Sequence, residues 1–269
     1  MLQQRCAMLQ RVLRSPSAMR FSSVVTRASS TAPYLCYDVP VSNHGARVRF
    51  VAYKKSLPVT FVQPSEIGGL KSEAYLKLNP QGKMPLLVPS SGTALYESEV
   101  IIQYLLDKYR EQGPSLIAPT PELRASGALV TRIHDIYIAA IQGCMYRKME
   151  SAEQRVKDLA QLAVQLDAIE ALVVGPFICG DTITAPDGAL FPTVVFMEHI
   201  LPKYFGWPGI FQGRPLLAKW WDSVKEDPAA KKVISEVQGG LDAWEKSDRW
   251  NALGIVQQVA ENKHLKFSP

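Results

Sequence analysis

The stretch "NPQGKMPLLVPSSGTALYESEVIIQYL", residues 79–105, places a proline directly before an apolar run. Pro85 has no N–H, so it cannot donate to a sheet ladder and belongs at the first residue of a strand or on an edge strand. Residues 86–88 nevertheless have the composition of a buried strand. Residues 93–97 follow a Ser-Ser-Gly turn, and apolar side chains recur at helical spacing after Ser98. The stretch therefore predicts a hairpin followed by an amphipathic helix.

Two interpretations of Pro85 are open. If the Met84–Pro85 bond is cis, the chain turns sharply, and the N–H and C=O of Met84 face outward to pair with an extended peptide. The alternative is a proline that only protects a sheet edge. Residues 85–88 alone favour the edge, whereas Glu97-Ser98 further along the chain favours the docking surface.

The first half of the chain alternates strand and helix signals. Residues 33–39 and 58–64 are short apolar or β-branched segments that predict strands, and residues 46–55 and 72–78 predict helices. Together with the opening stretch, this gives the order β-α-β-α-β-β-α. We expect one small mixed sheet within residues 32–111.

The second half has helical periodicity only. Residues 112–121 are rich in Pro and Gly and predict a linker, and apolar residues recur at helical spacing in residues 122–150 and 153–174. Thr184 and Asp187 have the spacing of a capping box at the start of a further helix. We expect an all-helical domain over residues 122–236 and a C-terminal extension without clear periodicity over residues 237–269.

The net charge of +5 does not predict nucleic-acid binding, because the excess lies in the first 31 residues. Those residues hold five arginines and no Asp, Glu or Lys; without them the chain has 25 basic and 25 acidic residues. The hydrophobic fraction of 47% is typical of a globular protein with a real core. No apolar run approaches the roughly 18 residues of a membrane span. We expect neither nucleic acid nor membrane as a partner.

Residues 1–31 have the composition of an organelle transit peptide. They are rich in Arg and Ser, free of acidic residues, and begin with leucines at helical spacing. The tetrapeptide Arg20-Phe21-Ser22-Ser23 resembles a mitochondrial processing site, and "VVTRASS" resembles the end of some plastid transit peptides. We favour the mitochondrial matrix over the plastid stroma.

Cysteine and histidine spacing indicates no metal site. Cys36, Cys144 and Cys179 are scattered and form no Cys-x-x-Cys pair, which also argues against a disulfide framework and fits a reducing compartment. The four histidines have no ligand spacing. We therefore expect no metal.

The order of elements, the proline before the third strand and the helical second half together resemble the glutathione S-transferase family, with theta-like or zeta-like features. "NPQGKMPLL" followed by "LYESEVIIQYL" resembles the signature of its N-terminal domain, and "GPFICGDTITAPDGALFP" (residues 175–192) resembles the start of its sixth helix. The resemblance covers residues 34–236. It implies a thioredoxin-like α/β domain, an all-α domain, glutathione as co-substrate and a homodimer.

The resemblance also implies a glutathione site. The backbone of Met84, before Pro85, would pair with the cysteinyl residue of glutathione. Ser98, at a helix N-terminus with positive potential, would bind the γ-glutamyl carboxylate, and Glu97 would bind the ammonium group. Lys83 would reach the glycyl carboxylate. Without the resemblance, the simplest interpretation is that Ser98 caps a helix, Glu97 is a neighbouring acid and Lys83 is solvated.

For the catalytic group, family members use a Ser, Tyr or Cys just after the first strand. Ser42 stands five residues before Arg47-Val48-Arg49, as the first serine of zeta-type "SSC" enzymes does, but Asn43-His44 replaces Ser-Cys here. A theta-like register would place Asn43 at the serine position. Cys36 lies inside the predicted strand, which argues against an omega-type, thiol-transferring enzyme.

Three functions follow from the resemblance. The first is conjugation of glutathione to a small hydrophobic electrophile bound against residues 130–147, near His134, Tyr137 and Tyr146. The second is a glutathione-dependent isomerase of the maleylacetoacetate kind, which the Ser42 spacing suggests and the missing Ser-Cys pair opposes. The third is a binding or scaffold module that retains the fold without turnover.

Overall fold

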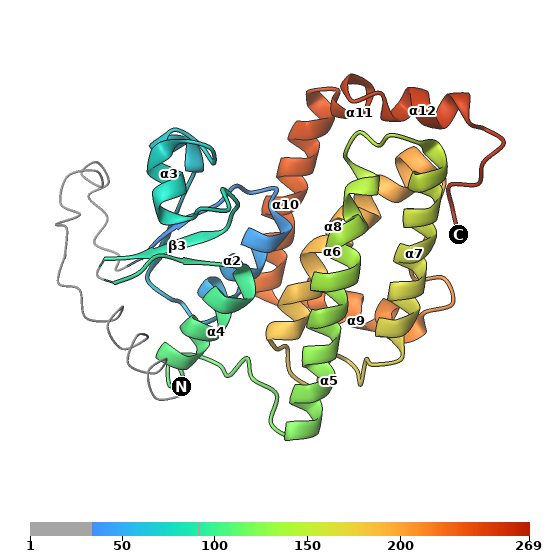
Figure 1. The fold of residues 1–269 in the computed structure, drawn as a ribbon. Coiled ribbons are helices and arrows are strands. Elements are labelled where there is room, and N and C mark those ends of the chain that lie inside the picture. The colour runs from blue at the N-terminus through green and yellow to red at the C-terminus, as the bar shows by residue number, and fades with distance from the viewer. Residues whose placement is uncertain (1–33, 91) are drawn as a thin grey trace, which may run out of the picture. The chain divides into compact units, whose positions relative to one another are not determined.

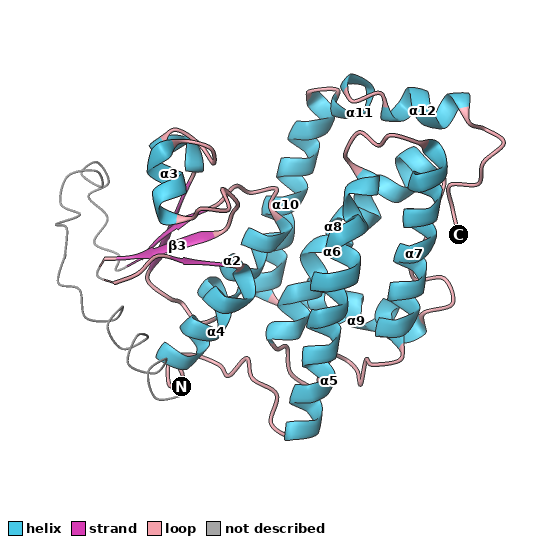
Figure 2. Ribbon diagram, in the orientation of Figure 1, coloured by secondary structure: helices cyan, strands magenta, loops and turns pink. Residues whose placement is uncertain are grey.

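The computed structural model describes residues 34–90 and 92–269. They form a small domain that holds the sheet and a larger domain made only of helices (Figures 1 and 2). The α/β plus all-α architecture expected from the sequence is confirmed. The expected transit peptide and Ser91 of the hairpin turn lie outside the described residues.

The sheet has four strands, β1 (Tyr34–Tyr37), β2 (Val59–Val62), β3 (Leu86–Pro89) and β4 (Leu95–Tyr96), in the order β2-β1-β3-β4. β1 pairs with β2 in parallel and with β3 antiparallel, and β3 and β4 form the predicted hairpin. β3 begins directly after Pro85, whose bond to Met84 is cis. A central strand therefore begins just after the proline.

Three α-helices and one 3-10 helix of the described chain cover the sheet. α2 (Asn43–Lys54) and α4 (Ser98–Lys108) pack against each other and carry most of the apolar core of the small domain. The 3-10 helix η1 (Pro64–Ile67) and α3 (Glu73–Leu78) lie apart from them, and their side chains form a separate small apolar cluster with the sheet. α2 and α4 thus face the helical domain, and α3 faces away from it (Figure 1).

The helical domain begins after a linker that is itself partly buried. Its elements in chain order are α5 (Pro121–Arg132), η2 (Ile133–Ile138), α6 (Ala139–Ile141), η3 (Gln142–Met145), α7 (Ala152–Glu170), α8 (Ala185–Phe205), α9 (Pro215–Glu226), α10 (Pro228–Lys246), α11 (Arg249–Ala252) and α12 (Ile255–Glu261). Among the described helices, none combines the length and the apolar content needed to cross a membrane.

The helical spacing over residues 122–150 does not correspond to a single α-helix. α5 passes into a π-helical segment, η2, and then into a short α-helix and a 3-10 turn. A π turn contains more residues than an α turn, so it shifts the helical phase. Ile138 and Gln142 are therefore buried, whereas Tyr137 and Ala140, expected on the inner face, are exposed.

The predicted capping box organises the start of α8. The buried Asp187 carboxylate accepts hydrogen bonds from the Thr184 N–H at 2.7 Å and the Thr184 hydroxyl at 2.8 Å. It also accepts from the Ile178 N–H at 2.9 Å and from Trp220 Nε1 at 2.8 Å. One acidic side chain thereby links the loop before α8 to α9 as well as capping the helix.

α8 packs directly against α2 of the small domain. A Cβ at Gly188 would lie 2.5 Å from Cδ1 of Phe50, so only glycine allows this approach. Phe50 also meets Phe191 edge to face, with ring centroids 5.4 Å apart. This contact holds the first helix of the small domain on the helical domain.

The expected boundary at residue 237 is also wrong, because α10 continues unbroken to Lys246. Gly240 of α10 packs on Val41, where a Cβ would lie 2.5 Å from the valine Cβ. Trp250 is buried, and its Nε1 donates a hydrogen bond to the Met145 carbonyl at 3.1 Å. The C-terminal residues therefore belong to the helical domain, and they support the residue that precedes Ser42.

Candidate active site

A cleft of about 940 Å³ lies between the two domains. Its small-domain wall comes from the starts of α2 and α4 and from the loop before β3, and its other wall comes from α5 to η3. The expected site residues of the small domain all line it: Ser42, Lys83, Met84, Pro85, Glu97 and Ser98. Side chains from three separate sequence segments thus share one cavity.

The loop before Pro85 is held by its own polar groups. The Lys83 carbonyl accepts hydrogen bonds from the Tyr75 hydroxyl and from Asn79 Nδ2, both at 2.7 Å. Asn79 Oδ1 accepts from the Gln81 N–H at 3.1 Å. Within the described part of the chain, the N–H and C=O of Met84 have no hydrogen-bond partner. The loop therefore presents the free N–H and C=O of one residue, Met84, to the cleft.

Glu97 and Ser98 join β4 to α4. Glu97 has φ of 69°, a conformation that residues other than glycine rarely adopt, and Ser98 is buried at the first position of the helix. No side chain caps the first turn of α4. Its N–H groups and the positive end of the helix dipole therefore suit an anion, and backbone strain of this kind is frequent at ligand sites.

Ser42 caps α2. Its Oγ accepts a hydrogen bond from the Gly45 N–H at 3.0 Å, and the nearby buried Asp38 carboxylate pairs with Arg49, whose Nε lies 3.0 Å from Asp38 Oδ2. A Cβ at Gly45 would lie 1.7 Å from Asp38 Oδ1, so the glycine is required. Burial raises the pKa of Asp38 to about 6, although the Arg49 guanidinium and the nearby Val39 N–H and Ser42 hydroxyl oppose the shift. Ser42 thus lines the cleft close to a buried carboxyl group.

The amide of Asn43 points into the protein. Its Nδ2 donates to Gln142 Oε1 and to Thr193 Oγ1, both at 2.8 Å, and its Oδ1 accepts from the His44 N–H at 3.0 Å. Both amide hydrogens are therefore already used in contacts with the helical domain. The Asn43 amide therefore has no free hydrogen to donate to a ligand in the cleft. This arrangement favours the Ser42 hydroxyl as the available donor.

A network of buried polar groups continues from this amide. His134 Nε2 lies 2.7 Å from Thr193 Oγ1, and its Nδ1 lies 2.9 Å from Asp135 Oδ1. Arg47, which is 1% exposed, pairs with Asp135 and with Glu99, each at 2.7 Å. Burial alone would raise the pKa of Asp135, but His134 and Arg47 hold it at about 2. The network joins α2, α4 and η2 beneath the cleft.

His44 lines the cleft next to Ser42, and its ring meets that of His134 edge to face at 5.8 Å. Burial, the nearby His134 and the Arg47 guanidinium lower the pKa of His44 to about 3, so its imidazole is neutral at physiological pH. Sequence analysis missed the roles of His44 and Arg47. Their spacing in α2 gives no signal until the helical domain is packed on it.

The expected residues of the second-substrate pocket separate into three places. Tyr146 lines the cleft, His134 is buried beneath it, and Tyr137 is 54% exposed and is not among the lining residues. The expectation that Tyr137 faces the pocket is wrong, because the π turn rotates it away. The helical wall is also more polar than expected, since it includes Arg132 and Arg147.

Cys36 lies within β1 and is fully buried, and burial raises the pKa of its thiol well above the usual value. A buried, protonated thiol is a poor nucleophile. The position of Cys36 therefore agrees with the inference against thiol transfer.

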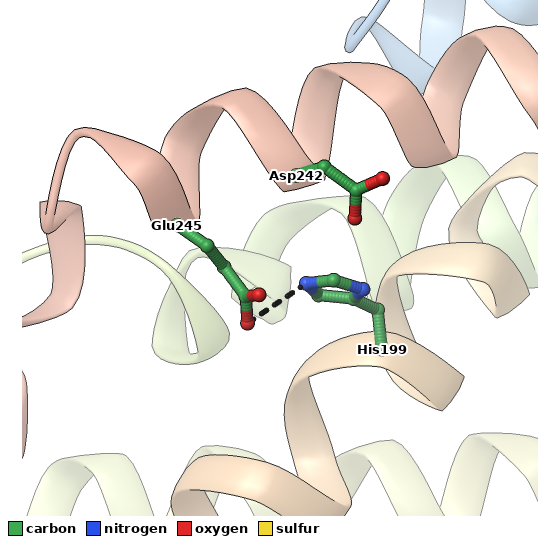
Figure 3. Close-up of side chains that lie close together, drawn as sticks. All are labelled: His199, Asp242 and Glu245. Atoms are coloured by element: carbon green, nitrogen blue, oxygen red, sulfur yellow. Dashed lines mark ion pairs between the residues drawn. The ribbon is translucent and has the colours of Figure 1, made fainter.

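Within the described residues, one group has the spacing of metal ligands, and it lies on α8 and α10 (Figure 3). His199 Nε2 lies 3.2 Å from Glu245 Oε1, and Glu245 also pairs with Lys203. Gln238 Nε2 lies 2.6 Å from His199 Nδ1 and 2.9 Å from Asp242 Oδ1. These contacts account for the cluster without an ion, and the expected absence of a metal stays a prediction.

Comparisons with known proteins agree with this geometry. Residues 37–113 match the family model of the glutathione S-transferase N-terminal domain, and residues 151–222 match that of the C-terminal domain. Glutathione S-transferase 3 of Zea mays is 30% identical over 223 residues, covering 77% of this chain and 95% of that protein. The probable glutathione S-transferase DHAR4 of Arabidopsis thaliana is 27% identical over 193 residues, covering 68% of this chain and 79% of that protein.

Among solved structures, the glutathione transferase URE2P6 from Phanerochaete chrysosporium, in complex with oxidized glutathione, superposes with a TM-score of 0.68 at 21% identity. The match covers 79% of this chain and 99% of that one, and it shows a common fold. The theta-like or zeta-like subtype stays a prediction. The two domain matches and the relative of Zea mays decide the family: the chain belongs to the glutathione S-transferases and is a transferase enzyme.

Proposed function

We propose that this enzyme conjugates the thiolate of glutathione to small electrophiles, with Ser42 as the group that stabilises the thiolate. Glutathione is its co-substrate. The observation that carries the proposal is the shared cleft, in which the Ser42 hydroxyl, the free peptide group of Met84 and the start of α4 face one cavity.

These groups match the three parts of glutathione. The N–H and C=O of Met84 pair with the cysteinyl backbone as an added strand would. Ser98 and the start of α4 bind the γ-glutamyl carboxylate, and Glu97 binds the ammonium group. Lys83, which is exposed at the cleft, binds the glycyl carboxylate. The cysteinyl sulfur then lies on the side of Ser42.

Activation of the thiol requires only a small movement. A free thiol has a pKa of about 8.5, and hydrogen-bond donors near the sulfur favour the thiolate. The Ser42 hydroxyl can direct its proton toward the sulfur by rotation about its Cβ–Oγ bond while Oγ still accepts from the Gly45 N–H, and the N-terminus of α2 adds positive potential. The sulfur electron pair forms a C–S bond with the electrophilic carbon, and the leaving group departs with its own electron pair.

Turnover with glutathione tests this proposal. The full chain is assayed with glutathione and 1-chloro-2,4-dinitrobenzene, and the released chloride and the thioether are quantified. Retention on immobilised glutathione without formation of thioether would contradict the proposal and support the module. A cis–trans isomerase of the maleylacetoacetate kind would convert its substrate without consuming glutathione, so the glutathione balance separates that activity from conjugation.

We also propose a homodimer. Large apolar side chains are exposed on α4 and on the α5–η2 segment: Val100, Leu129, Ile136 and Tyr137 are 49%, 53%, 44% and 54% exposed. A second copy of the chain would cover this surface. Light scattering should give twice the chain mass, and Leu129→Glu should reduce it; a monomer at micromolar concentration would contradict the dimer.

Residues 1–31 are proposed to direct the protein to an organelle, the mitochondrial matrix rather than the plastid stroma. The support is their composition alone, rich in Arg and Ser and free of acidic residues. Fusion of these residues to a fluorescent protein, followed by microscopy with markers for both organelles, tests the proposal. Plastid or cytosolic fluorescence would contradict it.

A further inference from the structure

We infer that the acceptor substrate of this enzyme carries a carboxylate, and that Arg147 is the side chain that selects it. The inference rests on the proposed conjugation and adds the chemical class of the second substrate. It departs from the small hydrophobic electrophile expected from the sequence.

The first observation is the balance of charge in the cleft. Four cationic side chains line it, and Arg47 among them already pairs with two carboxylates. Lys83 belongs to the wall proposed to bind glutathione. Arg132 and Arg147 lie on the helical wall, and neither has an acidic partner within ion-pair distance in the described chain. This wall therefore carries positive charge that the protein itself does not neutralise.

The second observation is that the backbone at Arg147 is held in place while its side chain is exposed at the cleft. Its N–H donates to the Gly143 carbonyl at 2.8 Å, and its carbonyl accepts from Arg155 Nη2 at 3.1 Å. A Cβ at Gly143 would lie 3.1 Å from Arg147 Cδ, so the glycine leaves room for the stem of the arginine. The guanidinium carbon lies 5.8 Å from the centre of the Tyr146 ring, within the range of a cation–π contact.

Tyr146 supplies a second group suited to a carboxylate. Burial raises the pKa of its hydroxyl, so this phenol is a hydrogen-bond donor at neutral pH. Arg249 donates to the Tyr146 carbonyl at 3.5 Å and adds positive potential to that of Arg147. A guanidinium and a neutral phenol on adjacent residues can together donate to the two oxygens of a carboxylate.

The third observation places Arg147 on the acceptor side, near Ser42. Asn43, which follows Ser42, donates to Gln142, and Gln142 precedes Tyr146 by about one helical turn. The Tyr146 ring also packs on Trp244 at 5.6 Å, in the same helix whose Gly240 supports Val41. The segment around Ser42 and the Tyr146–Arg147 pair thus both contact η3, through Gln142, and α10.

Arg132 lies at the other end of this wall. It precedes Asp135, which pairs with Arg47 on the side of Glu99 and α4. Arg132 ends α5 and Arg147 follows η3, so the two arginines lie at opposite ends of the segment that forms this wall. Arg132 is therefore near the γ-glutamyl end, and Arg147 is the cation available to the acceptor. An acceptor without charge would cover this guanidinium without pairing it, which is unfavourable.

The test uses a matched pair of acceptors, 4-chloro-3-nitrobenzoate and its methyl ester, with the full chain and glutathione. Arg147→Gln should lower kcat/KM for the carboxylate about tenfold or more, the size of one charge-assisted hydrogen bond, mainly through KM. The ester should change less than about twofold. Lys148→Gln is the control, because it removes the same charge from the neighbouring residue, which is exposed and does not line the cleft. Arg147→Lys should restore part of the preference.

Calorimetry gives a readout that does not depend on turnover. The ligands are S-(4-carboxy-2-nitrophenyl)glutathione, its methyl ester and glutathione itself. The carboxylate should bind the native protein more tightly than the ester, and Arg147→Gln should abolish that difference without changing glutathione affinity. Equal affinities for carboxylate and ester, or an unaltered difference in Arg147→Gln, would overturn the inference. Selective binding of the carboxylate without turnover of either acceptor would support the anion site and contradict the proposed conjugation.

Discussion

The two walls of the cleft are built in different ways. The small-domain wall uses main-chain groups, namely the peptide of Met84 and the first turn of α4, and local hydrogen bonds such as those to the Lys83 carbonyl hold them. The helical wall uses side chains on a helix that changes its winding from α to π to 3-10. Beneath both lies the buried network of Asn43, His134 and Arg47.

Because of this difference, we expect the two walls to have different roles in substrate binding. In the proposed function, main-chain groups in a fixed turn bind the peptide of one constant co-substrate, and such groups depend little on the identity of their side chains. Side chains on a helix can be exchanged without a change of backbone, so they set which acceptor is bound. The network must keep the two walls in a fixed relative position. Its removal is therefore expected to have the largest effect, a loss of free energy of unfolding.

Arg47→Met should reduce the free energy of unfolding by about 3 kcal/mol, because it leaves the Asp135 and Glu99 carboxylates without their buried partner. Denaturant unfolding measures the change. Arg110→Met is the control: it removes an exposed pair with Asp107 and should cost less than about 0.5 kcal/mol. Equal losses in both variants would mean that the network does not hold the walls together.

Ser42→Ala should lower kcat about a hundredfold and raise the pH at which the bound thiolate forms, because the sulfur loses its hydroxyl donor. Thiolate absorbance against pH and steady-state turnover measure the two effects. Thr120→Ala is matched to it, since Thr120 caps α5 as Ser42 caps α2. Both variants should lose about 1 kcal/mol of stability.

Only Ser42→Ala should lose turnover. If the thiolate titrates at the same pH in Ser42→Ala as in the native enzyme, hydroxyl activation is ruled out. Asn43→Ala should leave the thiolate titration unchanged and destabilise the protein, because its amide is bound to Gln142 and Thr193. A larger shift of the titration in Asn43→Ala would instead support the theta-like register.

Glu97→Gln and Ser98→Ala should raise KM for glutathione about tenfold with little change in kcat, since they remove contacts far from the sulfur that are equal in ground and transition states. Calorimetry with glutathione gives the affinities directly. Glu111→Gln, at an exposed position just before the linker, is the control for the loss of a negative charge. Unchanged affinities would leave Ser98 as a buried helix-start residue without a role in binding.

The smallest expected effect is a pH dependence of stability. Burial lowers the pKa of His44 to about 3 and also lowers that of His134. The unfolded chain takes up protons near pH 6.5 and the folded chain does not, so this stability is lost as the pH falls from about 6.5 toward 3. His44→Gln should weaken that dependence, and His264→Gln, in the exposed tail, should not. If stability depended on pH equally in His44→Gln and His264→Gln, His44 would not be buried in solution.

Several features could be predicted from the sequence because they depend on local chemistry. The order of strands and helices follows from hydrophobic period, and the Thr184–Asp187 box follows from its spacing. The proline before β3 indicated a docking surface, and the structure leaves the Met84 peptide free of partners within the described chain. These features involve residues within a few positions of one another, so their physics is contained in the sequence.

Other features depend on packing between distant segments. Tyr137 was expected in the pocket because an α-helical period was assumed, and the π turn that rotates it outward follows no motif in the sequence. The end of the chain has no clear period, yet Gly240 supports Val41 and Trp250 bonds to Met145. The choice between Ser42 and Asn43 also depended on contacts across the two domains.

The sequence by itself determined the fold, the family and the wall of the cleft that we propose binds glutathione, since periodicity, turn chemistry and helix capping are local. Only the tertiary structure decided that Asn43 is bound inside the protein, that Arg47 joins α4 to η2, and that Arg147 remains without an acidic partner in the described chain. The physical reason is that a side chain's role depends on which groups of opposite charge or matching hydrogen bonds lie within a few ångströms. For residues about 50 to 150 positions apart, that is set by how the helices pack.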